Sequence, residues 1–327
     1  MPTPATISPA SADALSLYEQ MWTIRIFEQQ AVELFRRGLI RGTVHPSIGQ
    51  EAIAAGVCSA LRHDDYILST YRGHGHCIAK GGHLGRMMAE LLARFDGYCK
   101  GKGGSMHLCD PDIGYLGANG IVGAGIPLAG GVALSMKLQQ RDQVAVCFFG
   151  DGASNQGVFH ESANMASIWK LPVVFICENN GYGLSMPASA ACSVKDIASR
   201  ASSYGFPGWS IDGNDCMAVV QAAERAVARA RAGDGPSLIE CKTHRWEKHS
   251  ALSRPYHADP QDATLWSRHD PIERLRKDLM AMKLLDAAAD EQIQRRARQR
   301  IAQAVDFAIQ SEEAPQQEAL SDVLGND

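Results

Sequence analysis

Two short polar motifs, Gly150-Asp-Gly152 and Asn179-Asn-Gly181, carry the residues with the most evident chemistry. An Asp carboxylate, an Asn carbonyl and a nearby main-chain carbonyl are hard oxygen donors of the kind that Mg²⁺ prefers, and this ion usually completes its shell with water and phosphate. Gly150 and Gly152 let the backbone turn sharply and approach a ligand closely. The helix start that follows offers free N–H groups to an anion. Together these residues predict a magnesium–diphosphate site.

Each motif follows a short apolar run, at residues 144–149 and 173–177. Such runs without alternation are typical of strands that are covered on both faces, as in a parallel sheet. Residues 155–170 between them have apolar side chains at helical spacing. A strand–helix–strand unit forms a right-handed crossover, so both strands end at the same edge of the sheet. Ligands bind at that edge in open parallel sheets, which predicts that Asp151 and Asn180 meet there.

The order of the motifs is more specific than either motif alone. A lone Gly-Asp-Gly is usually just a turn, but here 26 residues separate it from Asn179, and a strand precedes each half. This pattern resembles thiamine diphosphate enzymes, and the chain resembles the alpha subunit of the dehydrogenase component of 2-oxo acid and acetoin dehydrogenase complexes. The resemblance runs over about residues 21–243, through the segments Thr70-Tyr-Arg-Gly-His-Gly, Gly101-Lys-Gly-Gly-Ser-Met-His and Gly117-Ala-Asn-Gly-Ile-Val-Gly-Ala.

The resemblance implies a fold and a set of site residues. The fold is α/β, a parallel sheet with helices on both faces that forms the diphosphate-binding half of a thiamine diphosphate-binding fold, followed by C-terminal helices. The implied Mg²⁺ ligands are Asp151, Asn180 and the main chain of Tyr182, and the implied proton-handling residues are His74 and His249. The residues expected to hold the cofactor are Tyr71, Arg72, Gly120, Ile121, Val122, Gly150, Gly152, Ala153, Asn180 and His249. The chemistry of Arg72 agrees, because a guanidinium grips phosphate oxygens with a planar fork.

Other ligand sites remain as alternatives. His74, His76 and Cys77 could form a zinc cluster or only a polar loop, although no fourth ligand lies nearby with finger-like spacing. Residues 97–103 superficially resemble a nucleotide P-loop, but the positions that the pattern requires do not match. No Gly-x-Gly-x-x-Gly follows a strand, which weakens a dinucleotide-binding interpretation.

The chain is too short to complete a thiamine diphosphate site. In the family, the cofactor's own aminopyrimidine removes the proton from the reactive carbon, and a carboxylate on a separate pyrimidine-binding domain activates it. The 327 residues contain a single recognisable parallel α/β unit. Glu51 is a tempting carboxylate, but it lies near a helix start, where a charge near the helix dipole is the simpler interpretation. The resemblance implies that a beta subunit supplies this half in a tetramer of two alpha and two beta chains, with transfer to a separate lipoyl acyltransferase core.

The segment 243–268 departs from the family pattern. The family carries Tyr-Arg-Tyr-His-Gly-His-Ser, whereas this chain has Glu247 and Lys248 before His249 and Ser250. The departure leaves the substrate side open between pyruvate, acetoin and another 2-oxo acid. Two other functions are considered: a split transketolase-like subunit for ketol transfer, and a non-catalytic cofactor-binding assembly protein.

Composition sets the remaining expectations. The net charge is −4, from 32 Lys plus Arg and 36 Asp plus Glu, which argues against nucleic-acid binding and is ordinary for a cytoplasmic protein. No apolar run is long enough for a membrane span. The nine cysteines are scattered and odd in number, which favours free thiols in a reducing compartment.

We expect a disordered tail over residues 1–12, the α/β domain over 13–268 and a helical extension over 269–327. Helices are predicted over residues 13–37, 270–284 and 290–310. Another is predicted over 47–61, with Ser47 as its cap and Gln50 completing a capping box.

Overall fold

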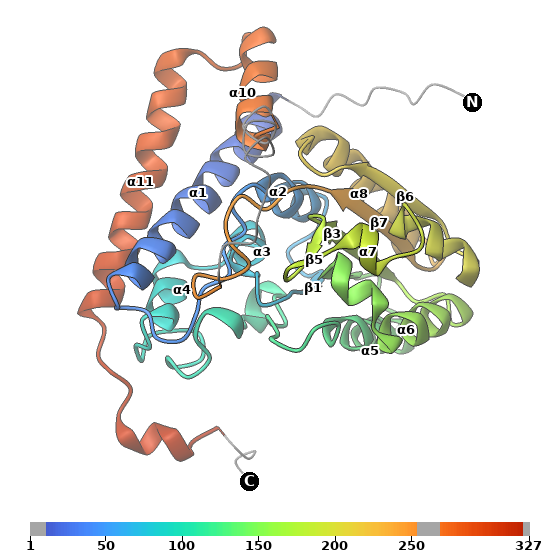
Figure 1. Cartoon of the computed structure of the whole chain (residues 1–327), viewed down its shortest axis with the longest axis horizontal. Coiled ribbons are helices and arrows are strands. Elements are labelled where there is room, and N and C mark those ends of the chain that lie inside the picture. The colour runs from blue at the N-terminus through green and yellow to red at the C-terminus, as the bar shows by residue number, and fades with distance from the viewer. Residues whose placement is uncertain (1–10, 254–268, 323–327) are drawn as a thin grey trace.

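A parallel five-stranded sheet forms the centre of the computed structural model, which describes residues 11–253 and 269–322 (Figure 1). The strand order is β1-β2-β3-β7-β6. Its strands are β1 (Tyr66–Leu68), β2 (Ala145–Gly150), β3 (Val173–Asn179), β7 (Ser237–Lys242) and β6 (Gly208–Asp212). β2 and β3 pair directly, from Ala145 with Val173 to Gly150 with Glu178. This confirms the predicted parallel sheet and places the ends of the two strands side by side.

Helices cover both faces of this sheet, as predicted. Along β2, Cys147 and Phe149 pack into the cluster on the α5 and α6 side, whereas Val146 and Phe148 pack into the opposite cluster, which includes residues of α1, α2 and α8. Because strand side chains alternate between faces, a strand buried on both sides is apolar throughout. The helices around the sheet are α1 (Ser11–Arg36), α2 (Glu51–Ser59), α3 (His74–Ala79), α4 (Leu84–Leu91), α5 (Gly125–Leu138), α6 (Gly157–Ile168), α7 (Ala188–Ala191) and α8 (Cys216–Arg231).

Short elements complete the connections. A small antiparallel hairpin joins β4 (Tyr182–Gly183) to β5 (Met186–Pro187), directly after the end of β3. The 3-10 turns are η1 (Gly104–Met106), η2 (Pro111–Ile113), η3 (Asp151–Asn155), η4 (Ile197–Tyr204) and η5 (Gln316–Leu320). The sequence predicted an α-helix directly from residue 155. In the structure, the 3-10 turn η3 follows β2, and α6 begins only at Gly157.

The predicted cap of α2 is wrong. α2 begins at Glu51, and Gln50 occupies its N-cap position without a side-chain cap hydrogen bond. Ser47 lies too early to cap the helix, because its Oγ and its main-chain N both donate to Glu28 Oε1, at 2.8 and 3.0 Å. The pattern identified a helix correctly and misplaced its N-cap by three residues.

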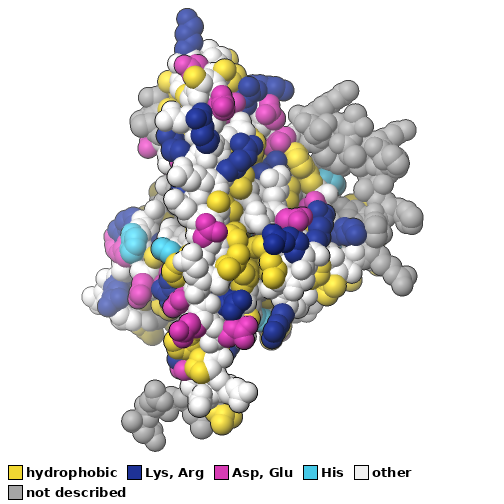
Figure 2. Space-filling model, turned by 90° about the vertical axis from the view of Figure 1, so that its left-hand side faces the viewer, with side chains coloured by type: hydrophobic (Ala, Val, Ile, Leu, Met, Phe, Trp, Pro, Cys, Tyr) yellow, Lys and Arg dark blue, Asp and Glu magenta, His cyan; other side chains and the backbone are white. Residues whose placement is uncertain are grey.

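Two C-terminal helices, α10 (Pro271–Ala281) and α11 (Ala287–Gln310), pack against α1 and α4. The predicted apolar stripe is buried there, at Ile293, Ala297, Ile301, Ala304 and Ala308. Figure 2 looks onto this side of the molecule and shows basic and acidic side chains interspersed. The ion pairs Arg295–Glu291 and Arg296–Glu19 belong to this mixture. Such a surface agrees with a solvated outer helix, and the domain division at residue 269 stays a prediction.

Two expectations concern the chain as a whole. The predicted tail lies outside the described residues apart from its last two, which begin α1. Across residues 11–253 and 269–322, no helix has the length and apolar character that a membrane crossing requires.

Candidate active site

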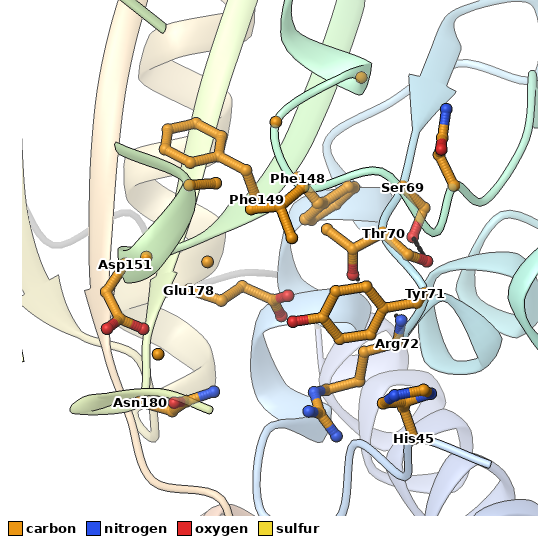
Figure 3. A pocket seen from close by; sticks show the side chains of 18 of the residues that line it. His45, Ser69, Thr70, Tyr71, Arg72, Phe148, Phe149, Asp151, Glu178 and Asn180 are labelled. Carbon is orange, nitrogen blue, oxygen red and sulfur yellow. Dashed lines mark hydrogen bonds between the residues drawn. The ribbon is translucent and has the colours of Figure 1, made fainter. Parts of the chain in front are cut away.

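A cavity of about 460 Å³ lies at the edge of the sheet where β1, β2 and β3 end. The residues that follow these three strands line it, together with the loop around Gly120 and two side chains of the 243–253 segment, Arg245 and His249. Figure 3 shows Asp151 and Asn180 on one side of the cavity and Tyr71, Arg72 and His45 across from them. The two motifs therefore meet at one edge of the sheet, as the sequence predicted.

Asp151 and Asn180 form one side of the cavity. Asp151 is 3% exposed, and no Lys, Arg or His forms an ion pair with it in the described part of the chain. Burial raises the pKa of Asp151 to about 6, although main-chain N–H groups of its own turn and the charge of Arg245 oppose the rise. Asn180 donates from Nδ2 to Gln50 Oε1 at 3.1 Å, and its Oδ1 accepts from Tyr182 N at 3.4 Å. A buried carboxylate with adjacent amide and carbonyl oxygens suits a hard divalent cation.

Two buried arginines, Arg72 and Arg245, also line the cavity. Arg72 is 4% exposed and donates to the carbonyl oxygens of Pro46 and His249, and no carboxylate forms an ion pair with it among the described residues. Arg245 is 2% exposed and donates from Nε to Glu247 O at 3.1 Å. Burial and the like charge of Arg245 lower the pKa of Arg72 to about 10. Concentrated buried positive charge favours an anionic ligand here.

Three aromatic rings pack together at this side of the cavity. His45 lies 4.6 Å from Tyr71 and 5.2 Å from His249 between ring centroids, and Tyr71 and His249 are 5.4 Å apart. Burial and the Arg72 charge lower the pKa of His45 to about 3, and burial with both arginines lowers the pKa of His249 to about 4. Both imidazoles are therefore neutral near pH 7, and His45 Nδ1 has no hydrogen-bond partner among the described residues. A neutral imidazole can accept a proton, which becomes easier once an anion is bound nearby.

His74 is the one predicted site residue that the structure keeps out of the cavity. It starts α3 and is fully buried, with Nδ1 2.9 Å from Glu28 Oε2 and Nε2 2.9 Å from Ser105 Oγ. Tyr71 and Arg72 face the cavity, but the turn into α3 directs His74 towards α1 instead. Both ring nitrogens are thus engaged by the protein, and the expected proton-handling role of His74 stays a prediction.

The zinc alternative finds no support in the geometry. His76 Nδ1 pairs with Ser69 Oγ at 2.7 Å and its Nε2 lies 3.3 Å from Glu178 Oε1, while its ring stacks on Phe148. Burial raises the pKa of the Cys77 thiol well above its usual value, which disfavours the thiolate that zinc requires. Within residues 11–253 and 269–322, no group of three or more His, Cys, Asp or Glu side chains is arranged to hold a metal ion.

Main-chain groups line the space between the two charged sides. The glycines of the first motif leave it open, because a Cβ added at Gly152 would meet only Gly183 Cα, at 3.5 Å. Ile121 and Val122 belong to the cavity lining and are 72% and 44% exposed. The other predicted cofactor-binding residues in the lining are Tyr71, Arg72, Gly120, Gly150, Ala153, Asn180 and His249.

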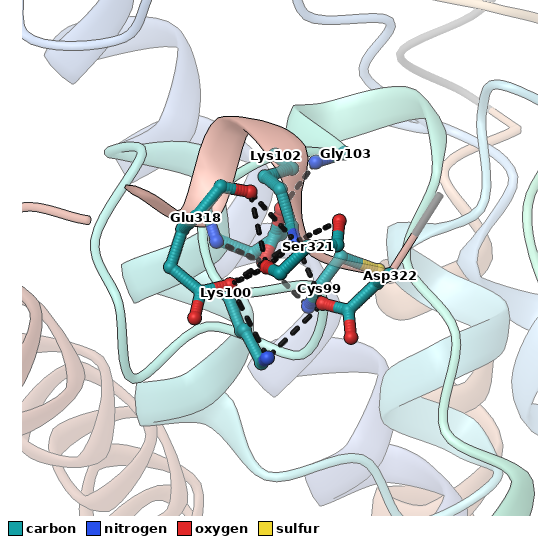
Figure 4. Close-up of polar contacts among 9 residues, drawn as sticks. Cys99, Lys100, Lys102, Gly103, Glu318, Ser321 and Asp322 are labelled. Atoms are coloured by element: carbon teal, nitrogen blue, oxygen red, sulfur yellow. Dashed lines mark hydrogen bonds and ion pairs between the residues drawn. The ribbon is translucent and has the colours of Figure 1, made fainter. Parts of the chain in front are cut away.

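A buried carboxylate organises the loop that leads to the cavity wall. Glu90 is fully buried and accepts four main-chain N–H groups, from Cys99, Gly101, Gly103 and Gly104, at 2.7 to 3.0 Å. The C-terminal segment crosses the outside of this loop, where Lys100 and Lys102 form ion pairs with Glu318 and Asp322 (Figure 4). The loop continues to Ser105, which holds His74, and to Met106, which lines the cavity.

The cavity residues that had not been assigned to the site from the sequence include His45, Gln50, Glu178 and Arg245. His45 lies in a loop without periodicity, and Gln50 was assigned to a capping box. Glu178 lies near the end of β3, and nothing in the sequence distinguishes it from the rest of that strand. Arg245 matches the arginine of the family pattern in the 243–268 segment, so the pattern offered a signal for this residue. Glu51 does not line the cavity, because Arg25 pairs with its buried carboxylate and Gly49 N donates to it.

Comparisons with known proteins agree with this geometry. The family model described as "Dehydrogenase E1 component" matches residues 19–318. The alpha subunit of the acetoin:2,6-dichlorophenolindophenol oxidoreductase of Bacillus subtilis is 48% identical, over 97% of this chain and 95% of that protein. The corresponding subunit of Cupriavidus necator is 42% identical over 95% of this chain and 92% of that protein. The pyruvate dehydrogenase E1 component subunit alpha of Rhizobium meliloti is 40% identical over 95% and 90%. With the match spanning nearly its whole length, the chain belongs to the dehydrogenase E1 component family.

Proposed function

We propose that this chain is the alpha subunit of an E1 component that cleaves acetoin or pyruvate and passes the two-carbon unit to lipoamide on an acyltransferase core. The names of the relatives support a dehydrogenase over the transketolase-like and non-catalytic alternatives. Acetoin is the first substrate to test, because two relatives at 48% and 42% identity are named for it. Nine free cysteines support a reducing compartment, and we place the reaction in the cytoplasm.

The observation that carries the proposal is the opposed charge requirement of one cavity. Asp151 is a buried carboxylate without an ion-pairing cation, and Arg72 is a buried guanidinium without an ion-pairing carboxylate, among the described residues. Burying either charge alone is costly. A magnesium diphosphate group satisfies both at once, since the cation meets the oxygen donors and the phosphates meet the arginine. The residues present therefore fit the diphosphate end of thiamine diphosphate with Mg²⁺.

Each residue would contribute a defined interaction. Asp151, Asn180 Oδ1 and the main-chain carbonyl of Tyr182 would hold Mg²⁺. The diphosphate would be held by the side chains of Tyr71, Arg72 and His249 and by the main chain of Gly120, Ile121, Val122, Gly150, Gly152 and Ala153. When bound, thiamine diphosphate supplies a carbon nucleophile and stabilises the carbanion left by cleavage next to a carbonyl.

His249 and His45, which both line the cavity, are the candidates for proton handling. Both are neutral near pH 7, and each could accept or donate a proton at a ring nitrogen. Their rings contact Tyr71, which fixes their orientation relative to the diphosphate side. Arg72 holds the main chain of His249 through the carbonyl oxygen, at 3.1 Å.

The beta subunit would supply the carboxylate that activates the cofactor. Glu51 is committed to Arg25, and Glu178 is paired with His76 in the cavity wall. Glu178→Gln should therefore leave activation of the cofactor largely intact when the beta subunit is present. The isolated chain should not turn over acetoin or pyruvate, and turnover by it alone would contradict the half-site arrangement.

Calorimetry tests the proposed magnesium–diphosphate site. Asp151→Ala should abolish Mg²⁺-dependent binding of thiamine diphosphate, because the cation loses its only carboxylate ligand in the proposed set. Asp142→Ala is a matched control, since Asp142 is an exposed aspartate before β2, at the opposite end of that strand from the cavity. Unchanged affinity of Asp151→Ala for thiamine diphosphate would refute the proposed magnesium–diphosphate site. With the beta subunit added, reduction of a dye acceptor by acetoin or pyruvate then identifies the substrate.

A further inference from the structure

Gln50 stands out as a cavity residue with only one end of its amide engaged. It is 2% exposed, lines the cavity and reaches Asn180 from a different part of the fold, the start of α2. Its Oε1 accepts from Asn180 Nδ2 at 3.1 Å. Its Nε2 is buried and has no hydrogen-bond partner among the described residues. An amide donor left unsatisfied beside a cavity indicates that a ligand acceptor completes it.

We infer that Gln50 both orients the metal ligand Asn180 and donates a hydrogen bond from Nε2 to an oxygen of the bound diphosphate. The inference rests on the proposed function and adds to it a residue that takes no part in the family pattern considered above. Gln50 is a positioning residue through Asn180 and a binding residue through its own amide nitrogen.

The orienting role follows from the chemistry of the asparagine amide. The two ends of the group are nearly equal in size, but only the oxygen can bind a cation. Gln50 Oε1 engages the nitrogen end, so Asn180 Oδ1 is turned away from Gln50 and lies 3.4 Å from Tyr182 N. Without this acceptor, the amide could present its NH₂ group to the cation. Residues that orient metal ligands in this way typically change metal affinity by about 10- to 100-fold when they are replaced.

The main chain on both sides of Gln50 is fixed. Gly49 has φ +96°, and a Cβ there would lie 2.6 Å from Trp246 Cδ1, so only glycine fits. The Glu51 carboxylate accepts from Gly49 N at 3.1 Å and pairs with Arg25, on which Trp246 stacks at 4.5 Å. A side chain held on such a support can orient a neighbour without moving itself.

Two substitutions separate the two roles. Gln50→Glu keeps an oxygen that can accept from Asn180 Nδ2, but it loses the donor and adds negative charge beside the diphosphate. Gln50→Leu loses both functions at similar size. We expect Gln50→Leu to weaken Mg²⁺ affinity at saturating thiamine diphosphate by about 10- to 100-fold. Gln50→Glu should keep Mg²⁺ affinity at or above that of the wild type and bind thiamine diphosphate more weakly.

The measurement is calorimetric titration of the full chain assembled with its beta subunit, with Mg²⁺ and thiamine diphosphate as the probes. Gln143→Leu is the matched control: Gln143 Oε1 is also buried without a partner among the described residues, but this glutamine precedes β2, away from the cavity. It should bind both probes like the wild type.

Several results would overturn the inference. Wild-type affinity for both probes in a folded Gln50→Leu protein removes both roles. Loss of Mg²⁺ affinity in Gln50→Glu contradicts the orienting role, and unchanged thiamine diphosphate affinity in that variant contradicts the donor role. If Gln50→Leu does not fold, Gln50→Glu alone decides. Asp151→Ala separates a failure of the inference from a failure of the proposed function. If Asp151→Ala also binds Mg²⁺ and thiamine diphosphate like the wild type, the proposed function fails. If only the Gln50 variants bind both probes like the wild type, the inference alone fails.

Discussion

His45 and His74 occupy two regions of the molecule that differ in how completely their polar atoms are satisfied. His74, in the interior between α1 and α3, has both ring nitrogens hydrogen-bonded, to Glu28 and Ser105. His45, at the cavity, has an unsatisfied Nδ1 among the described residues. A group whose hydrogen bonds are complete stabilises the fold, whereas a buried group left incomplete is available to a ligand. Burial alone does not separate the two, since both histidines are buried.

The largest expected effect is on catalysis at the cavity. His249→Asn and His45→Asn should each lower kcat by about 10²- to 10⁴-fold if the imidazole transfers a proton. The melting temperature should stay close to that of the wild type. Steady-state kinetics with the beta subunit provides the measurement, with the exposed His63 changed to Asn as the control. Retained kcat in both cavity variants would place proton handling elsewhere.

The interior region should respond in stability instead. Glu28→Ala removes the acceptor of Ser47 and of His74, leaving buried donors unpaired, and we expect a loss of about 3 kcal/mol in the free energy of unfolding. Glu28→Gln retains an acceptor and should lose less. Urea denaturation measures both. A kcat defect in Glu28→Ala at saturating cofactor, without a loss of stability, would erase the contrast between the two regions.

A smaller effect should appear in the pH dependence of the free protein. The pKa values of His45 and His249 are lowered from 6.5 to about 3 and about 4, so the folded state binds fewer protons than the unfolded state below pH 6.5. Stability should therefore fall as the pH decreases from about 6.5 towards 4. His249→Asn should flatten this decline, as measured by urea denaturation at a series of pH values. An unchanged decline in His249→Asn would contradict the lowered pKa of His249.

The smallest effect is expected at the surface. Lys102→Ala removes ion pairs with Glu318 and Asp322 that are open to solvent, and such pairs contribute little because water screens them. Urea denaturation should show no measurable change relative to the wild type. If thiamine diphosphate affinity changed instead, the C-terminal segment would be coupled to the cavity through the loop that carries Ser105.

The parts of the site that follow local rules were accessible from the sequence. Asp151 and Asn180 each come directly after or close to the end of an apolar strand, and the crossover between the strands fixes which edge they share. His45, Gln50 and Arg245 reach the same cavity from loops and a helix start, whose paths depend on tertiary packing. The sequence also could not show that His74 lies outside the cavity lining: two residues beyond Arg72 the chain enters α3, and there His74 contacts Glu28 and Ser105. Ser47 was taken for a cap because the pattern cannot show that Glu28 engages its hydroxyl.

A crystal structure of the complex with its beta subunit, Mg²⁺ and thiamine diphosphate would test the central claim most directly. The account predicts the cation at about 2.1 Å from a carboxylate oxygen of Asp151, from Asn180 Oδ1 and from the carbonyl oxygen of Tyr182, with phosphate oxygens completing its shell. Arg72 should contact the phosphates from the opposite side. A cation bound through other side chains, or a diphosphate located away from the ends of β2 and β3, would contradict it.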